Sequence, residues 1–281
     1  MRIVSDPARM LQLAEEARRE GKSIGLVPTM GALHEGHLSL VRRCRTENEL
    51  AVMTLFVNPI QFDRRDDLAR YPRDPDRDTA LAQTAGADLI YAPAAEAMYP
   101  PGYATYVTVE GLTDRWEGAT RPGHFRGVAT VCTKLFAACR PYRAYFGQKD
   151  YQQALAIRRL VADLNLGLEI VVLPTVREAD GLALSSRNAL LTRQERRQAP
   201  VLSQALFAAQ SAVRSGERDA ETLRAGIEAT IRTAESAVVD YVAVCDRDTL
   251  EPLVRIGRRA VALVAARFGS VRLIDNVLLD V

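Results

Sequence analysis

Residues 24–40, IGLVPTMGALHEGHLSL, decide the fold of this chain. The run begins with apolar residues from Ile24 to Val27, which predict a buried parallel strand. Pro28 ends that strand because it has no N–H for a ladder hydrogen bond. A helical pattern follows from Gly36, and its inward positions are expected to be Leu38, Val41 and Cys44.

The turn between this strand and this helix predicts an anion site. Gly31 and Gly36 let the backbone pass close to a ligand. Unpaired N–H groups and the positive end of the helix dipole attract phosphate at a helix N-terminus. His34 and His37 are three residues apart, so they share one face of the first helical turn. Two of the three histidines in the chain therefore lie where a phosphate is expected.

Alternatively, these two histidines could form half of a zinc site that His124 completes. Zinc usually needs three or four converging ligands, and no cysteine or second histidine pair supports that interpretation. The H-E-G-H spacing is instead the H-x-G-H signature of nucleotidyltransferases and class I aminoacyl-tRNA synthetases. Four residues recur by chance, so the placement between a strand and a helix gives the motif its weight.

The composition is that of an ordinary globular protein with room for about two domains. Of its 281 residues, 48% are hydrophobic and 26% are charged. The net charge of +2 leaves no electrostatic footprint for nucleic-acid binding, which counts against a tRNA synthetase. No apolar run has the length of a membrane span, and the N-terminus lacks the apolar segment of a signal peptide. Four scattered cysteines without C-x-x-C pairing predict free thiols in the cytoplasm.

Alternating strands and helices up to Val176 predict a Rossmann-like, doubly wound α/β domain with a parallel sheet. Its expected strands are 24–27, 50–57, 88–91, 106–109, 142–147 and 168–173, with a polar loop at 58–71. Helices at 192–216, kinked near Pro200, and at 220–233 precede strands at 238–244, 260–266 and 271–279. That order predicts a second, smaller α+β C-terminal domain, so the expected domains are 1–176 and 177–281.

A second glycine turn, Gly147-Gln148-Lys149-Asp150, also opens a helix. Ligands of doubly wound sheets bind at the carboxyl ends of strands, where the strand order reverses. This placement predicts Lys149 near phosphates and Asp150 near a ribose hydroxyl. Gln153 lies one helical turn further on the same face, and Gln61 lies in the loop after the neighbouring predicted strand.

The third candidate segment is Ser185-Ser186-Arg187, just beyond the expected domain boundary. Two hydroxyls and a guanidinium can clamp a polyphosphate, because arginine makes planar bidentate contacts. Taken alone, the sequence S-S-R-N would be an ordinary turn.

Seven strings in collinear order resemble the pantothenate synthetase (pantoate–β-alanine ligase) family of the H-x-G-H nucleotidyltransferase superfamily, over essentially the whole chain. They are PTMGALHEGH at 28–37, FVNPIQF at 56–62, YPRDPDRD at 71–78, MYPPGY at 98–103, EGATRPGHFRGVATV at 117–131, FGQKDYQQ at 146–153 and DGLALSSRN at 180–188.

The resemblance implies an ATP-dependent ligase that works in two half-reactions. The carboxylate of pantoate attacks the α-phosphate of ATP, and the resulting pantoyl adenylate is then attacked by the amine of β-alanine. The products are pyrophosphate, AMP and pantothenate. The implied catalytic residues are His37, as proton donor or transition-state stabiliser, with His34, Lys149 and Arg187 on the phosphates.

The resemblance also implies the substrate pockets. The ATP-binding residues would be Met30, Gly31, His34, Gly36, His37, Gly147, Lys149, Asp150, Val176, Leu184, Ser185, Ser186 and Arg187. Pantoate and β-alanine would be bound by Gln61, Gln153 and Asn58. Leu184 stands where methionine is common in the family, which is a mild apolar exchange.

The resemblance further implies that Mg²⁺ is held mainly by ATP. It also implies that the protein is a homodimer. Similar proteins often carry adjacent acids near 77–78 that help to hold Mg²⁺. Here one of them is Arg77, which leaves Asp78, with Asp76 as a second candidate, so the protein ligands stay open. Two alternatives remain. Another H-x-G-H adenylyltransferase would have no reason to carry Gln61 and Gln153 together, and a non-catalytic nucleotide sensor would bind ATP without turnover.

Overall fold

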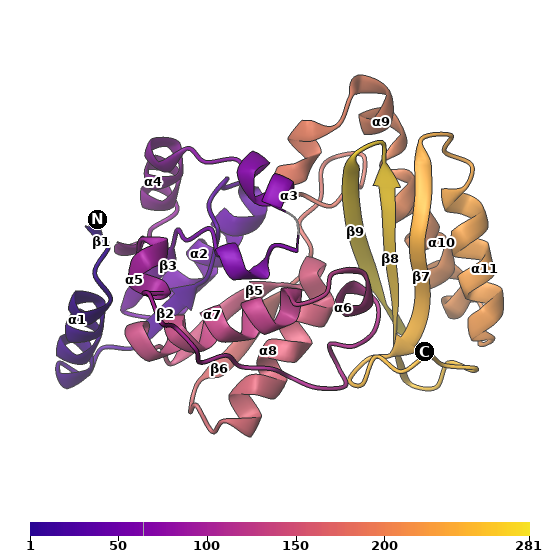
Figure 1. Ribbon diagram of the computed structural model, residues 1–281. Helices are drawn as coiled ribbons and strands as arrows, with labels where there is room; N and C mark the ends of the chain where they lie inside the picture. The colour runs from indigo at the N-terminus through magenta and orange to yellow at the C-terminus, as the bar shows by residue number, and fades with distance from the viewer. Residues whose placement is uncertain (64) are drawn as a thin grey trace. The chain divides into compact units, whose positions relative to one another are not determined.

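Six parallel strands form the sheet that carries the first glycine turn, in the order β1-β4-β3-β2-β5-β6. The computed structural model describes residues 1–63 and 65–281 (Figure 1). The strands are β1 (Arg2–Val4), β2 (Ile24–Val27), β3 (Leu50–Thr54), β4 (Leu89–Tyr91), β5 (Arg143–Gly147) and β6 (Glu169–Leu173). The strand order reverses between β2 and β5, which places the expected ligand crevice at their carboxyl ends. The predicted Rossmann-like, doubly wound fold is confirmed.

Helices cover both faces of this sheet, because its strand residues alternate between two cores. Ile24 and Leu26 of β2 pack in one core, and Val27 packs in the other. The first core is closed by α1 (Pro7–Arg19), α7 (His124–Cys139) and α8 (Tyr151–Asp163). The second is closed by α2 (Glu35–Glu47) and α4 (Pro75–Thr84). Strands apolar on both faces are expected of such a layered fold, and they explain the short apolar runs in the sequence.

The structure of this unit differs from the sequence analysis at four places. β1 was not predicted, and the second strand ends at Thr54 instead of residue 57. Residues 106–109, predicted as a strand, have no regular structure, because the Val107 amide donates to Thr130 Oγ1 (3.0 Å) rather than to a neighbouring strand. The predicted loop 58–71 contains a 3₁₀ turn, η1 (Pro59–Gln61), and helix α3 (Arg65–Arg70); Arg64 lies outside the described residues. Two further short helices are α5 (Ala95–Met98) and α6 (Glu117–Thr120).

The second compact unit holds a three-stranded antiparallel sheet, β7-β8-β9. Its strands are β7 (Ala237–Asp246), β8 (Arg259–Phe268) and β9 (Val271–Asp280). Helix α10 (Val201–Arg214) packs on β9, and α11 (Ala220–Ile231) packs on β7. The kink expected near Pro200 separates α10 from α9 (Arg193–Gln198). This unit is the predicted smaller α+β fold.

The two compact units are not two uninterrupted halves of the chain. The first comprises residues 1–147 and 152–173, and the second comprises residues 148–151 and 174–281. The 3₁₀ turn η2 (Gln148–Asp150) and Tyr151 therefore belong to the second unit, although β5 before them and the rest of α8 after them belong to the first. A domain boundary at Val176 stays a prediction. None of the helices in residues 1–63 and 65–281 is both long and apolar enough to cross a membrane.

Candidate active site

The turn after β2 is held by a buried carboxylate from α4. Asp78 is 2% exposed, and its two oxygens accept from the backbone amides of Ala32 and Leu33, each at 2.8 Å. Both Gly31 (φ +86°) and Ala32 (φ +51°) have left-handed backbones, which is unusual for alanine. A Cβ at Gly31 would lie 2.8 Å from Asp78 Oδ2. Asp78 therefore stabilises a strained turn, in which only glycine fits at position 31.

His34 and His37 lie together at the N-terminus of α2. Their ring centroids are 4.1 Å apart, and the His34 amide donates to Nδ1 of His37 at 3.4 Å. Because Nδ1 accepts, the proton of a neutral His37 ring is on Nε2, which can donate to a ligand. A Cβ at Gly36 would lie 2.9 Å from the His34 ring, so glycine makes room for that ring. The predicted juxtaposition of both histidines with a helix N-terminus is present.

Gln61 lies in a chain of hydrogen bonds within the first unit. Tyr99 Oη donates to Asn58 Oδ1 (2.7 Å), and Asn58 Nδ2 donates to Gln61 Oε1 (3.0 Å). Gln61 Nε2 in turn contacts Met30 Sδ at 3.1 Å. Burial raises the pKa of the Tyr99 hydroxyl, which keeps it protonated as a donor at neutral pH. Asn58 and Gln61 are 1% and 7% exposed, so the orientation of the Gln61 amide is fixed by its neighbours.

His124 also supports Gln61, through the backbone carbonyl of that residue. Its Nδ1 lies 2.9 Å from the Gln61 carbonyl oxygen, and its Nε2 lies 3.2 Å from Arg121 Nη1. A carbonyl oxygen only accepts, so Nδ1 carries the ring proton and Nε2 accepts from Arg121. The third histidine thus positions the backbone at Gln61.

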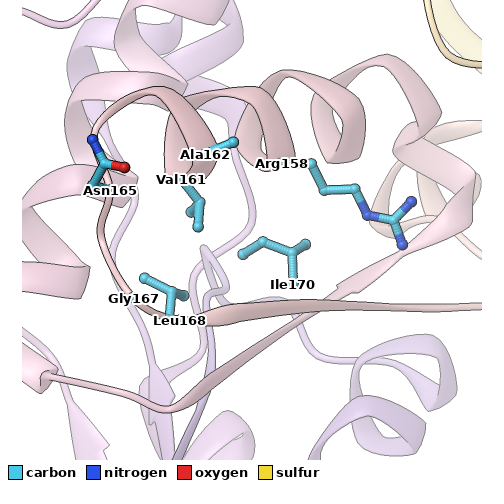
Figure 2. A pocket seen from close by; sticks show the side chains of 7 residues that line it. All are labelled: Arg158, Val161, Ala162, Asn165, Gly167, Leu168 and Ile170. Atoms are coloured by element: carbon cyan, nitrogen blue, oxygen red, sulfur yellow. The ribbon is translucent and has the colours of Figure 1, made fainter.

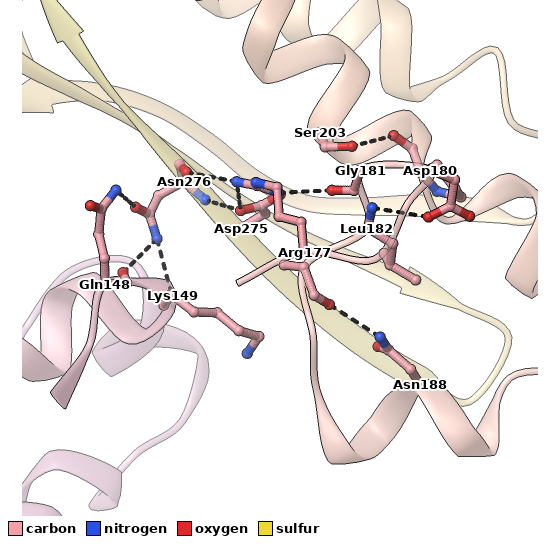
Figure 3. Close-up of polar contacts among 12 residues, drawn as sticks. Gln148, Lys149, Arg177, Asp180, Gly181, Leu182, Asn188, Ser203, Asp275 and Asn276 are labelled. Carbon is pink, nitrogen blue, oxygen red and sulfur yellow. Dashed lines mark hydrogen bonds and ion pairs between the residues drawn. The ribbon is translucent and has the colours of Figure 1, made fainter. Parts of the chain in front are cut away.

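The Lys149 turn in the second unit is tied to β9. Asn276 Nδ2 donates to the carbonyl oxygens of Gln148 and Lys149, each at 2.9 Å. Gln148 Nε2 donates back to Asn276 Oδ1 at 3.1 Å (Figure 3). Lys149 Nζ lies 3.9 Å from Asp150 Oδ1, so the two predicted ligand groups of this turn are adjacent.

The Ser185–Arg187 segment follows a short hairpin of the same unit. The hairpin pairs Arg177 with Ala183 across an antiparallel bridge, and the Leu184 amide donates to Val176 O at 3.0 Å. Ser185 then caps the 3₁₀ turn η3 (Ser186–Leu190), because its Oγ accepts from the Arg187 amide at 3.2 Å. The hairpin thereby brings Val176 beside Leu184, two residues predicted to bind ATP.

The structure brings some predicted site residues together within each unit. Gln61 contacts both Met30 and Asn58 in the first unit, and Gln153 is half-buried in the first turn of α8. Residues that sequence reasoning missed are Tyr99, Arg177, Asp275 and Asn276. The last two could have been noticed, because RLIDNVLL is an apolar strand interrupted by two adjacent polar residues.

A separate hollow of about 560 Å³ opens beside the start of β6 (Figure 2). Its lining comes from the C-terminal part of α8, the connection to β6 and the start of β6: Arg158, Val161, Ala162, Asn165, Gly167, Leu168 and Ile170. This is the amino end of a parallel strand, whereas doubly wound sheets bind ligands at the carboxyl ends. The hollow is therefore distinct from the candidate site.

A parallel sheet of this order, with H-x-G-H at the start of the helix that follows β2, defines the class of H-x-G-H nucleotidyltransferases. The sequence model of the family described as pantoate-β-alanine ligase matches residues 2–278. The chain belongs to the pantoate–β-alanine ligase family.

Individual relatives agree over the full length. The chain is 54% identical to the pantothenate synthetase of Moorella thermoacetica over all 281 residues, which cover 99% of that relative. The crystal structure of pantothenate synthetase from Thermus thermophilus is similar with a TM-score of 0.93, at 50% identity and 99% coverage of both chains. The pantoate-β-alanine ligase of Francisella tularensis, complexed with Beta-gamma ATP and β-alanine, is similar with a TM-score of 0.82. It is 32% identical, with 99% of this chain and 97% of that one covered.

Proposed function

We propose that this protein condenses pantoate with β-alanine at the expense of ATP, through a pantoyl adenylate. The observation that carries the proposal is family membership over residues 2–278, joined to a glycine turn and paired histidines at a helix N-terminus. The Francisella tularensis relative, which is complexed with Beta-gamma ATP and β-alanine, supports ATP and β-alanine as two of the substrates. A different adenylyltransferase or a nucleotide sensor would not account for the full-length family match.

In the first half-reaction, a carboxylate oxygen of pantoate forms a bond to the α-phosphorus and pyrophosphate leaves. We assign the stabilisation of the phosphate oxygens to the N-terminus of α2, with His34 and His37. Nε2 of His37 is the donor, because its Nδ1 already accepts from the His34 amide. The reaction needs positioning and charge neutralisation, and it uses no covalent nucleophile of the protein.

The pantoate pocket is assigned to Gln61, Gln153 and Asn58. Asn58 donates to Gln61 Oε1, and one Nε2 hydrogen of Gln61 points at Met30 Sδ, so the second Nε2 hydrogen would serve a substrate oxygen. In the second half-reaction the amine of β-alanine attacks the acyl carbonyl and AMP leaves. We assign Gln61 to both substrates; Asn58 and His124 hold it on the protein side, and Tyr99 in turn holds Asn58.

The second unit supplies the remaining ATP contacts in this proposal. Lys149 and Arg187 provide positive charge for the phosphates, and Ser185 and Ser186 provide hydroxyl donors. Asp150 with Gly147 would hold the ribose. The remaining pocket residues are Met30, Gly31, Gly36, Val176 and Leu184.

Mg²⁺ is proposed to enter with ATP, held mainly by phosphate and water oxygens. Among residues 1–63 and 65–281, no group of three or more His, Cys, Asp or Glu side chains could hold a metal ion. Asp78 is the carboxylate nearest in sequence to the family's acidic pair, and both of its oxygens already accept backbone amides. When bound, Mg²⁺ would neutralise phosphate charge, and the role we assign to Asp78 is holding the turn.

A homodimer in the cytoplasm completes the proposal. Within the described residues β6 pairs only with β5, and Ile170 to Leu173 are partly exposed on this edge strand. Edges of this kind pair readily with another chain. The four cysteines, all described, are buried free thiols, as a reducing compartment allows. Sedimentation equilibrium would give twice the 31.0 kDa chain mass for a dimer.

Exchange of labelled pyrophosphate into ATP tests the proposed activity. The exchange should require pantoate and should proceed without β-alanine, because the adenylate forms first. ATP binding with no exchange under any condition would favour the sensor. Exchange that is indifferent to pantoate but stimulated by another acceptor would favour a different adenylyltransferase.

A further inference from the structure

Two adjacent polar residues interrupt the apolar strand β9. Asp275 and Asn276 are 3% and 2% exposed, although Val271, Leu273, Val277 and Leu279 of the same strand lie in the core of the second unit. Buried polar groups are costly unless they are fully hydrogen-bonded. Neighbouring residues of a strand point to opposite faces of the sheet, so these two side chains can hold two different segments.

On one face, Asn276 holds the Lys149 turn. Its amide group makes three hydrogen bonds to this turn: two from Nδ2 to the carbonyl oxygens of Gln148 and Lys149, and one from Gln148 Nε2 to its Oδ1. A second tie comes from Tyr151, whose Oη donates to the Arg247 carbonyl at 2.9 Å. The backbone that carries the Lys149 side chain is therefore fixed to β9.

On the other face, Asp275 holds the hairpin that precedes Ser185. Arg177 makes a bidentate ion pair with Asp275, at 2.6 and 2.9 Å, and donates to the Gly181 carbonyl at 3.0 Å (Figure 3). Its guanidinium also stacks 5.0 Å from the ring centre of Phe207 on α10. Asn188 closes the segment, since Nδ2 donates to Ala183 O and to Glu178 Oε1.

We infer that Asp275 and Asn276 are positioning residues, which fix the Lys149 turn and the Ser185–Arg187 segment to one rigid strand. The inference rests on the proposed function, because it assigns phosphate binding to both segments. Preorganised charges act on a transition state without reorganising, so a strand that fixes their spacing raises the rate of adenylate formation. Neither residue needs to touch the substrate.

The first test couples Asn276 to Lys149 in a double-mutant cycle. Asn276→Asp keeps the side-chain shape but points a carboxylate at two carbonyl oxygens, and should slow pantoate-dependent pyrophosphate exchange by about ten-fold or more. The KM for ATP should rise and that for pantoate should not. In the Lys149→Ala background the same substitution should have little further effect, because the group it positions is gone. Asn276→Ser, which cannot reach both carbonyls, replaces Asn276→Asp if that variant does not fold.

The second test treats the other face in the same way. Arg177→Lys keeps the charge but cannot reproduce the bidentate pair with Asp275. Its effect on exchange should be largely lost in the Arg187→Ala background. Val277→Ala is the matched control: it trims the core beside Asn276, should lower the melting temperature and should leave the exchange rate of folded protein unchanged.

Equal losses from Asn276→Asp with and without Lys149, or a rise in both KM values, would overturn the inference and leave Asn276 a structural residue. The inference would also fail if Val277→Ala slowed exchange as much as Asn276→Asp at equal stability. Failure of the wild-type protein to exchange pyrophosphate with pantoate would instead refute the proposed function, so the two failures are distinguishable.

Discussion

At the scale of single residues, His37 carries the most specific chemical assignment. His37→Ala should slow adenylate formation by about 10²-fold or more, the scale of losing one preorganised donor. Pantoate-dependent pyrophosphate exchange measures this step directly. Since His37 is half-buried and belongs to none of the hydrophobic cores, the melting temperature should fall only by the loss of its hydrogen bond from the His34 amide. Near-normal exchange in a folded variant would reduce His37 to a structural histidine.

A substitution of Asp78 tests whether its carboxylate holds the strained turn at Gly31 and Ala32. Asp78→Asn replaces one of two accepting oxygens by a donor that faces a backbone amide, which costs about 1–3 kcal/mol for a buried unsatisfied pair. Both the free energy of unfolding and the rate of exchange should fall, because Gly31 and Ala32 lose the contact that fixes them. Urea unfolding and exchange would be measured on the same preparation. Lost stability with an unchanged rate would mean that the turn forms without Asp78.

The two glutamines should separate pantoate binding from ATP binding. Gln61→Ala and Gln153→Ala should each weaken pantoate binding by about 1–3 kcal/mol, because polar substrate groups are left unpaired. Tyr99→Phe should weaken it less, since it removes only the outer hydrogen bond to Asn58. Isothermal titration with pantoate and with ATP measures both affinities. Loss of ATP affinity with normal pantoate affinity would show that the pocket is assigned wrongly.

At the scale of secondary-structure elements, α9 is joined to the hairpin by Arg196. Its guanidinium contacts Asp180 Oδ2 (2.6 Å) and Glu178 Oε2 (2.7 Å), and its hydrogen bond lowers the pKa of Asp180. A lowered carboxyl pKa stabilises the folded state above the unfolded value, and that stability is lost as pH falls through the folded value. Arg196→Gln should thus be less stable than the wild type at pH 7. The difference should shrink below about pH 4, the ordinary range for aspartate.

Urea unfolding of both proteins from pH 7 downwards would follow that difference. The groups are partly exposed, so the effect should be modest and should weaken in salt. A difference that grows towards acid pH would mean that Arg196 acts through packing or through other groups.

The elements that the sequence predicted well are those whose pattern repeats. α2 and α8 have apolar residues at helical spacing, and β2 and β8 are short apolar runs, so local pattern and structure agree. β1 has three residues and too little pattern to be recognised. Residues 106–109 have strand-like composition, but their backbone bonds with a side chain of α7, which is a tertiary contact.

The residues of the candidate site likewise fall into those that local sequence predicts and those that it does not. Glycine turns and histidines at a helix N-terminus follow from chain-local geometry, so the sequence predicted them. Tyr99, Asn276 and the amide contacts of Asp78 join segments far apart in the chain, and no local pattern encodes such pairs. The sequence could mark Asp275 and Asn276 as odd in an apolar strand, but not name their partners.

At the scale of the whole molecule, Arg187 separates the two half-reactions. Arg187→Ala should slow adenylate formation far more than amide formation from preformed pantoyl adenylate, because only the first step has pyrophosphate as the leaving group. Arg187→Lys should recover part of the loss, since a point charge cannot give bidentate contacts. Single-turnover measurement of each half-reaction checks this. Equal slowing of both would mean that Arg187 serves the fold generally.

The adenylate is the central claim, and the fate of one oxygen atom tests it most directly. Pantoate labelled with ¹⁸O in its carboxylate would be turned over with ATP and β-alanine, and the products analysed by mass spectrometry. Attack of the carboxylate on the α-phosphorus leaves one labelled oxygen on that phosphorus when the amine displaces AMP. The predicted result is one ¹⁸O in each AMP formed. Label in pyrophosphate or in free phosphate, with none in AMP, would contradict the adenylate route.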